Sequence, residues 1–398
     1  MKQSRLIHRG TRSAGDGHLG GKKTVLHPSI SVRDWPTEAG TRALKGFIAL
    51  EDATAVQRIE AAGAELVGNT TMNELGLGID MDGAGPAVAT GEADLALVVD
   101  HMGESRVGAA RSGLAGYKPS YGIISRFGLI GLIPSMECLG LMAKDPADIR
   151  AAVAVACGDD DRDYTLSELM PDFGKRNEDP TAGCRLGVVT EALALLDSNE
   201  REAFTYALEV LKESGCSLSD ASMAELDLFS TVHHVIGSVE ASSSAGKFDG
   251  VRYGHRAKGA KDWNEMYLKT RGESFGPMLK SLLFQGAFYQ FEHYDAFEDA
   301  CRIRSRLVSN LEDIFGKVDF LVLPTSHGVI PEGEAVTISD LYNLFRFTLP
   351  ANLAGLPAFH LPCGEGNPPV QVMGKRFDDV RLLDLAIHLA RKNGGNKS

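Results

Sequence analysis

The sequence is poor in cysteine and has no apolar run long enough to cross a bilayer. Its 6 cysteines among 398 residues stand apart, without a CxxC pair or the spacing of a disulfide framework. Scattered thiols of this kind are typical of a reducing compartment. The opening residues, MKQSRLIHRGTRSAGDGHLGG, also lack the apolar core of a secretion signal. We therefore expect a cytoplasmic protein that makes no membrane contact.

Positive charge is scarce as well. The chain has 41 lysines and arginines but 53 acidic residues, which gives a formal net charge of −12. A nucleic-acid surface needs clustered positive charge, so this class of partner is excluded. The adjacent His233 and His234 have no further metal-type neighbours in the sequence, and we assign them to a helix surface rather than to a zinc site. We expect neither a metal nor a cofactor.

What is present is an alternation of short apolar runs with amphipathic segments. Strands are predicted over 24–33, 64–68, 95–99, 185–189 and 320–323, and helices over 52–63, 145–158, 199–214 and 378–392. Strands that alternate with helices predict an α/β fold, a layered sheet with helices on both faces. Residues 1–24 are expected to be a loosely ordered, flexible arm, and residues 25–398 a single domain.

One stretch, from Asp82 to Gly122, carries the most information. It reads DGAGPAVATGEADLALVVDHMGESRVGAARSGLAGYKPSYG. The run Leu95 to Val99 is β-branched and short enough to be a buried strand, and the polar cluster Asp100–Arg106 follows it directly. Catalytic groups often lie where a strand end meets a glycine, because glycine lets backbone and ligand approach closely. The candidates in this cluster are His101, Gly103, Glu104 and Arg106.

This stretch resembles the signature region of the amidase signature family. The segments PAVATGEADLALVVD and GLAGYKPSYG match it, and GAELVGNTTMNELGLG matches a segment upstream. EASSSAGKFDGVRYG and LPANLAGLPAFHLPCG resemble one branch of the family, the glutamine-hydrolysing A subunits of tRNA-dependent amidotransferases. The resemblance covers roughly residues 25 to 390. It implies the amidase signature fold, with a central mixed β-sheet covered by helices on both faces.

The same resemblance implies that the family's catalytic residues are replaced. Glu104 stands where the family has its nucleophilic serine, and Ala84 stands where it has the serine that relays the proton. ISVRDW stands where the family has a strand that ends in Lys-Asp, so the catalytic lysine becomes Arg33. Ser105 falls one residue late and is given little weight. An ordinary serine amidase is therefore not expected.

Two interpretations of Glu104 remain open. It can be the remnant of a retired active site, or a general acid/base, since a carboxyl group in a partly dry pocket suits proton transfer near neutral pH. Arg33 stays charged and cannot act as a base, but it can hold a carboxylate or form a structural ion pair. His101 is either a proton shuttle or hydrogen-bonded scaffold.

The second half of the chain bears on the substrate. Arg252 matches the arginine that holds the substrate carboxylate in the amidotransferase A subunits, and Phe345 replaces the acid that holds the α-ammonium group. With Arg33 or Arg106 as a second anion site, these residues predict a small anionic substrate without an ammonium group. The hypothesis is a deaminase acting on an enamine dicarboxylate such as 2-aminomuconate or 2-amino-5-chloromuconate. The alternative is an inactive, amidase-like scaffold or partner subunit, and a homo-oligomer is compatible with either.

Overall fold

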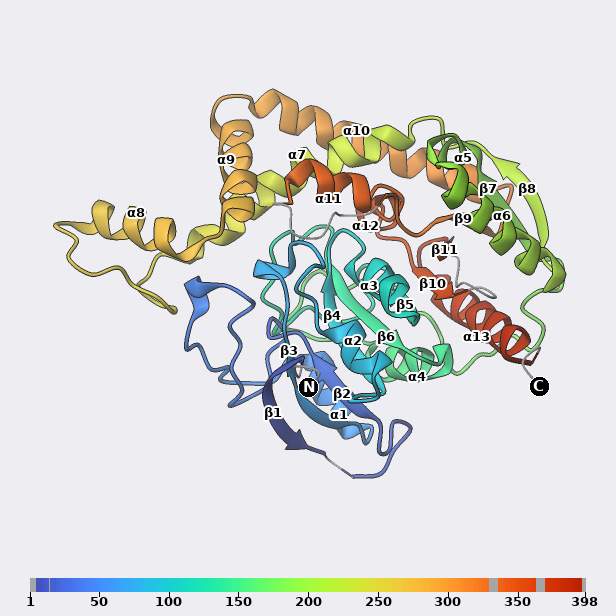
Figure 1. Ribbon diagram of the computed structural model, residues 1–398, viewed down its shortest axis with the longest axis horizontal. Coiled ribbons are helices and arrows are strands. Elements are labelled where there is room, and N and C mark those ends of the chain that lie inside the picture. Colours follow the sequence, from blue (N-terminus) through green and yellow to red (C-terminus); the bar gives the residue numbers. More distant parts are fainter. Residues whose placement is uncertain (1–4, 14, 329–335, 363–368, 396–398) are drawn as a thin grey trace.

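The computed structural model describes residues 5–13, 15–328, 336–362 and 369–395. Its centre is a mixed sheet of eleven strands, in the order β1-β3-β2-β4-β6-β5-β10-β11-β9-β7-β8 (Figure 1). The strands are β1 (Leu6–Arg12), β2 (Lys23–Leu26), β3 (Glu65–Thr70), β4 (Leu95–Asp100), β5 (Ala115–Lys118), β6 (Cys138–Ala143), β7 (Arg185–Val189), β8 (Ser217–Ala221), β9 (Phe320–Pro324), β10 (Ala358–Pro362) and β11 (Pro369–Gly374).

The helices in the first half of the chain are short, with the exception of α6. They are α1 (Thr54–Ala61), α2 (Ala84–Ala89), α3 (Glu104–Ser112), α4 (Pro146–Ala156), α5 (Thr190–Leu195) and α6 (Ser198–Glu213), with 3₁₀ turns η1 (Arg42–Leu44) and η2 (Glu74–Gly76). The second half contains α7 (Leu226–Ser244), α8 (Trp263–Ser274), α9 (Pro277–Phe291), α10 (Tyr294–Phe315), α11 (Ile338–Leu344), α12 (Leu349–Leu353) and α13 (Asp379–Gly395), with η3 (Ala245–Lys247) after α7.

Strand β4 shows why helices cover both faces of the sheet. Its side chains alternate between two apolar clusters, because successive residues of a strand point to opposite faces. Ala96 and Val98 pack with α2 and α3, whereas Leu97 and Val99 belong to the large core that includes α1 and α4. Both faces of β4 are therefore buried, which confirms the predicted α/β architecture.

The N-terminus is more ordered than the loose arm that the sequence predicted. Residues 6–12 form β1, which pairs antiparallel with β3, and β2 lies between β3 and β4 in parallel pairing. The sequence pattern did not show this, because β1 is an edge strand whose residues alternate between exposed and half-buried rather than between apolar and polar. The strand expected over 24–33 is also shorter than predicted and ends at Leu26.

The four helices predicted from the sequence are present as α1, α4, α6 and α13, with bounds that differ by a few residues. Helix α4 begins after Asp145, whose side chain accepts a hydrogen bond from the Ala147 backbone N–H, and Pro146 occupies the first helical position as expected. Helix α1 departs from the prediction, because its N-cap is Ala53. Asp52 instead pairs with Arg12 across 2.7 Å, so a long-range ion pair takes the place of the local cap.

Candidate active site

Helix α3 begins at Glu104, directly after the glycine that ends the β4 turn. Gly103 has φ +130°, a backbone conformation that residues with a Cβ rarely adopt. A Cβ at this position would lie 2.3 Å from Thr348 Oγ1, so the segment after α11 packs directly against the turn. Gly103 is thus required for backbone shape, and this close contact leaves it no room for a substrate.

The Glu104 carboxylate fills a nest of backbone N–H groups. Oε2 accepts hydrogen bonds from the backbone N–H of His101 at 2.9 Å, Met102 at 2.9 Å and Gly103 at 3.1 Å. Consecutive N–H groups of this kind form a concave site for anions. Here the anion is supplied by the chain itself, and Glu104 is only 1% exposed.

His101 is the second half of a buried ion pair with Glu104. Burial alone would lower the pKa of His101, but the charge of Glu104 opposes it and raises that pKa to about 9. The ring is therefore an imidazolium at neutral pH. Its Nδ1 lies 2.9 Å from Glu104 Oε1, although the two atoms are too poorly aligned for a good hydrogen bond. Its Nε2 lies 3.3 Å from the Leu75 carbonyl oxygen.

His233 and Tyr342 form a neutral layer behind this pair. His233 Nε2 donates to the His101 carbonyl oxygen at 2.8 Å, so its Nδ1 must accept the hydrogen bond from the Tyr342 hydroxyl at 2.9 Å. Burial lowers the pKa of His233 to about 3, which keeps the ring neutral. The expected helix-surface position of His233 is therefore wrong: it is buried on α7 and orients the His101 loop.

The Arg106 guanidinium is occupied by protein groups, contrary to the predicted role in holding a substrate anion. It is fully buried and donates to the Thr348 carbonyl at 3.2 Å and to Gln371 Oε1 at 3.0 Å, and it also bonds Asn352. It also lies 3.6 Å from Asp100. Burial alone would raise the pKa of Asp100, but the charge of Arg106 outweighs burial and lowers that pKa. Arg106 therefore anchors α3 to α12 and β11 and is not available as an anion clamp.

Arg33 also departs from its predicted role. It is exposed, its backbone N–H donates to Asp52 and its Nε donates to the Leu50 carbonyl. Among the described residues it makes no contact with Glu104. Because β2 ends at Leu26, the residue at the strand end is His27, which the sequence motifs did not single out.

His27 is buried, and both of its ring nitrogens are occupied. The Val99 backbone N–H donates to Nδ1 at 3.4 Å, so Nε2 carries the proton and donates to Asp82 at 3.1 Å. Strands β2 and β4 are parallel, which places His27 and the His101–Glu104 pair at the same edge of the sheet. A buried polar residue at a strand end was the clue that could have identified it.

The two predicted specificity residues are also not brought to Glu104. Arg252 is exposed in the segment between η3 and α8, and its guanidinium lies 5.8 Å from the centre of the Tyr253 ring. Phe345 is fully buried at the end of α11, where its carbonyl accepts from the Thr348 hydroxyl at 2.8 Å. Phe345 is therefore core packing, and neither residue forms the predicted carboxylate or ammonium subsite.

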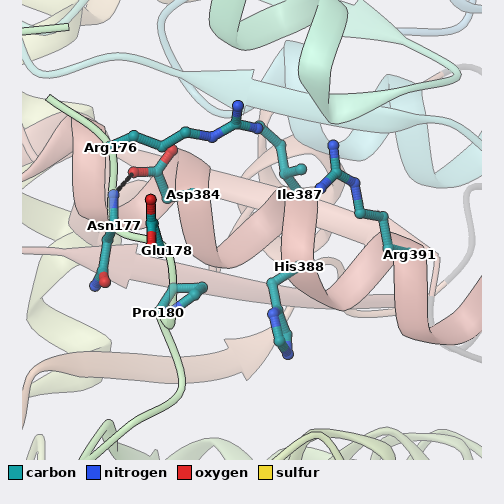
Figure 2. A pocket seen from close by; sticks show the side chains of 8 residues that line it. All are labelled: Arg176, Asn177, Glu178, Pro180, Asp384, Ile387, His388 and Arg391. Carbon is teal, nitrogen blue, oxygen red and sulfur yellow. Dashed lines mark hydrogen bonds between the residues drawn. The ribbon is translucent and has the colours of Figure 1, made fainter. Parts of the chain in front are cut away.

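A cleft of about 280 Å³ lies elsewhere, between α13 and the 176–180 segment (Figure 2). Its lining includes Arg176 and Arg391, while Asp384 is already bonded to Arg150 and to the Asn177 backbone N–H. It contains none of the predicted site residues. Within the described ranges, no group of three histidine, cysteine or acidic side chains could hold a metal ion, and no helix is long and apolar enough to cross a bilayer.

Comparison with known proteins identifies the family. The sequence profile of the family described as Amidase matches residues 8–83 and 82–383, so the chain belongs to the amidase family. This places it among the hydrolases of C–N bonds. The A subunit of the glutamyl-tRNA(Gln) amidotransferase of Symbiobacterium thermophilum is 35% identical over 411 residues, which cover 94% of this chain and 84% of the relative. That of Chloroflexus aurantiacus is 34% identical, with 92% and 82% covered.

Solved structures confirm the fold. The crystal structure of the glutamyl-tRNA(Gln) amidotransferase A subunit from Thermotoga maritima aligns with a TM-score of 0.78 and 24% identity, over 96% of this chain and 86% of that one. A 6-aminohexanoate cyclic dimer hydrolase complexed with substrate aligns with a TM-score of 0.77 and 20% identity, over 95% and 86%. The central mixed sheet flanked by helices is thus the amidase signature fold.

Proposed function

We propose that this amidase-family chain is a cytoplasmic, cofactor-independent deaminase that releases ammonia without an acyl-enzyme. The observation that carries the proposal is the buried Glu104–His101 ion pair at the N-terminus of α3, where the family resemblance expects a nucleophile. A carboxylate beside an imidazolium is equipped to move protons. It offers no hydroxyl or thiol for acyl transfer.

The reaction class that needs only proton transfer and water is enamine hydrolysis. Glu104, reprotonated by the His101 imidazolium, would donate a proton to the enamine carbon and so create an imine. Water, deprotonated by the Glu104 carboxylate, would add to the imine carbon. The Glu104 carboxyl group would then protonate the nitrogen of the carbinolamine. As the C–N bond breaks, Glu104 would take the proton of the new hydroxyl group, so that ammonia leaves and a 2-oxo compound remains. The substrates proposed for testing are 2-aminomuconate and 2-amino-5-chloromuconate, which carry no α-ammonium group.

A second candidate is favoured by a different observation, the enclosure of the same pair. Glu104 is 1% exposed, and one of its oxygens already accepts three backbone hydrogen bonds. A carboxylate held in this way also stabilises the backbone of the loop through its hydrogen bonds. This supports a catalytically inactive, amidase-like scaffold or partner subunit.

Ammonia release from 2-aminomuconate separates the two candidates. We expect turnover by the wild type and a loss of roughly 10²–10⁴-fold in Glu104→Gln, because the amide keeps the shape but cannot transfer the proton. Glu265→Gln, which removes a half-exposed carboxylate paired with Lys269 on α8, is the matched control and should retain full activity. Circular dichroism verifies that both variants are folded.

Each contrary outcome has a clear meaning. Wild-type turnover retained in Glu104→Gln removes Glu104 from the chemistry. Failure of the wild type to release ammonia from either muconate supports the scaffold. Stoichiometric acylation of Ser105 by a serine-directed reagent would overturn both candidates, because Ser105 is buried and hydrogen-bonded to Asp100.

A further inference from the structure

Helix α9 is apolar on two sides, although the protein covers only one of them. Its inner side packs on α7, where Gly286 approaches so closely that a Cβ would lie 1.9 Å from the Ser238 carbonyl oxygen. The outer side carries Phe284, Phe288 and Phe291, which are 74%, 47% and 76% exposed. Three exposed phenylalanines on one helix face are unusual for a surface that stays in water.

The outer side has the spacing of a helix–helix contact. Its exposed residues follow one another in alternating steps of four and three, the heptad pattern that keeps a stripe facing a partner helix. We call these residues the α9 seam: Pro277, Ser281, Phe284, Phe288 and Phe291. An unpaired seam of this kind requires a second helix, and among the described residues none covers it.

The size of the seam suits the core of a dimer interface. At about 200 Å² for each aromatic side chain, the exposed fractions of the three phenylalanines leave roughly 400 Å² of apolar surface. A standard interface buries about 800 Å² on each partner and surrounds an apolar centre with a polar rim. The aromatic surface and its rim therefore provide what each copy of a dimer must contribute.

The seam is complementary to itself when two copies run antiparallel. Phe284 is the midpoint of α9, so a two-fold axis there places Phe284 against its own copy. Phe288 then faces the small Ser281, and Phe291 faces Pro277. The two central phenyl rings meet at the axis, and on either side of it a large side chain meets a small one, which favours close packing.

Charge favours a second copy over a lipid surface. Lys280 lies near the start of α9, and the exposed acids Glu292 and Asp295 follow its end. Lys280 Nζ already donates to the Gly272 carbonyl oxygen of its own chain at 2.6 Å. Antiparallel pairing places the acids of one copy beside the N-terminus of α9 of the other copy, where the helix dipole favours negative charge. An anionic bilayer would instead meet these acids and a chain with a formal net charge of −12.

From these observations we propose that the α9 seam is the interface of a homodimer, in which α9 packs antiparallel against α9 of a second copy. Such an interface is isologous, so each copy uses the same residues. Figure 1 shows that α9 stands with α8 at the side of the molecule, away from the sheet edges β1 and β8, so a second copy can approach it. The inference is independent of the proposed function.

Sedimentation velocity of the full chain tests the dimer. At micromolar concentration, we expect the wild type to sediment as a species whose molar mass is twice the 42.7 kDa of one chain. Phe284→Asp with Phe288→Asp should weaken dimerisation at least 100-fold, because it buries charges in an apolar contact and those at position 284 face each other across the axis. The matched control is Tyr164→Asp, since Tyr164 is 97% exposed but lies outside the seam; this variant should remain dimeric.

Disulfide trapping tests the antiparallel arrangement. Under mild copper-catalysed oxidation by air, two Phe284→Cys thiols on the axis should lose two electrons and two protons and form one intermolecular bond. Phe291→Cys is the control and should not cross-link, because its opposite position is Pro277. The wild type, whose described cysteines are buried or half-buried, should also remain uncross-linked.

Several outcomes would overturn the proposal. A monomeric wild type would do so, whether or not it floats with phosphatidylglycerol vesicles. So would a dimer that survives the double aspartate variant. Cross-linking at position 291 with none at 284 would show a different arrangement of the two helices.

Discussion

The stability of this protein should depend on pH through one buried histidine. The pKa of His101 is raised from 6.5 to about 9 in the folded state, despite the opposing effect of burial, because the Glu104 charge lies against the ring. The folded state therefore binds the proton more tightly than the unfolded state. A group of this kind stabilises the fold fully below its unfolded pKa, and the contribution is lost as the pH rises through the folded value.

The shift in pKa sets the magnitude. At ~1.4 kcal/mol for each pH unit, a rise from 6.5 to about 9 corresponds to roughly 3 kcal/mol of unfolding free energy. We expect this amount to be present near pH 6 and nearly absent by pH 9.5. Glu104→Gln keeps an oxygen for the three N–H donors but removes the charge, so His101 should revert towards neutrality and most of the pH dependence should disappear.

Urea unfolding at half-unit steps between pH 6 and pH 9.5 measures this contribution. The informative quantity is the wild-type curve minus the Glu104→Gln curve, since titrations elsewhere in the chain cancel. His101→Gln provides a second route to the same loss if Glu104→Gln folds poorly. Glu265→Gln, at a half-exposed pair, should reproduce the wild-type curve.

Equal pH dependence in the wild type and in both site variants would refute this reasoning. A wild-type minus Glu104→Gln difference that rises with pH over the same interval would refute it as well, because the sign would then be that of a histidine held neutral. Direct NMR titration of the His101 ring provides an independent check on the folded pKa.

Two further predictions concern the backbone and the anchor of the same loop. Gly103→Ala should lower the free energy of unfolding in urea by roughly 3 kcal/mol or more, because of positive-φ strain and overlap with Thr348. A Thr348→Ala background should recover part of that loss. Wild-type stability of the Gly103→Ala variant would contradict the structure. Arg106→Met should lose ~3–5 kcal/mol, because Asp100 is left as a buried, unpaired charge. Arg111→Met, a half-exposed control on the same helix, should change stability by no more than ~0.5 kcal/mol.

The sequence by itself determined the fold class and the main features of the turn around Glu104. The apolar run 95–99 became β4 and the strands predicted at 185–189 and 320–323 became β7 and β9 almost to the residue. These features depend on local physics. The period of apolar residues and the special backbone of glycine are both readable in a short window.

The roles of the charged residues were decided only by tertiary structure. Three arginines were assigned to the substrate because of their chemistry, but Arg33 and Arg252 are exposed, and Arg106 is bonded to Asn352 and Gln371, more than two hundred residues away. His27 replaced Arg33 at the strand end because β2 stops early. A sequence window shows which charges a chain carries. It does not show which distant groups neutralise them, because those partners meet only when the sheet is assembled.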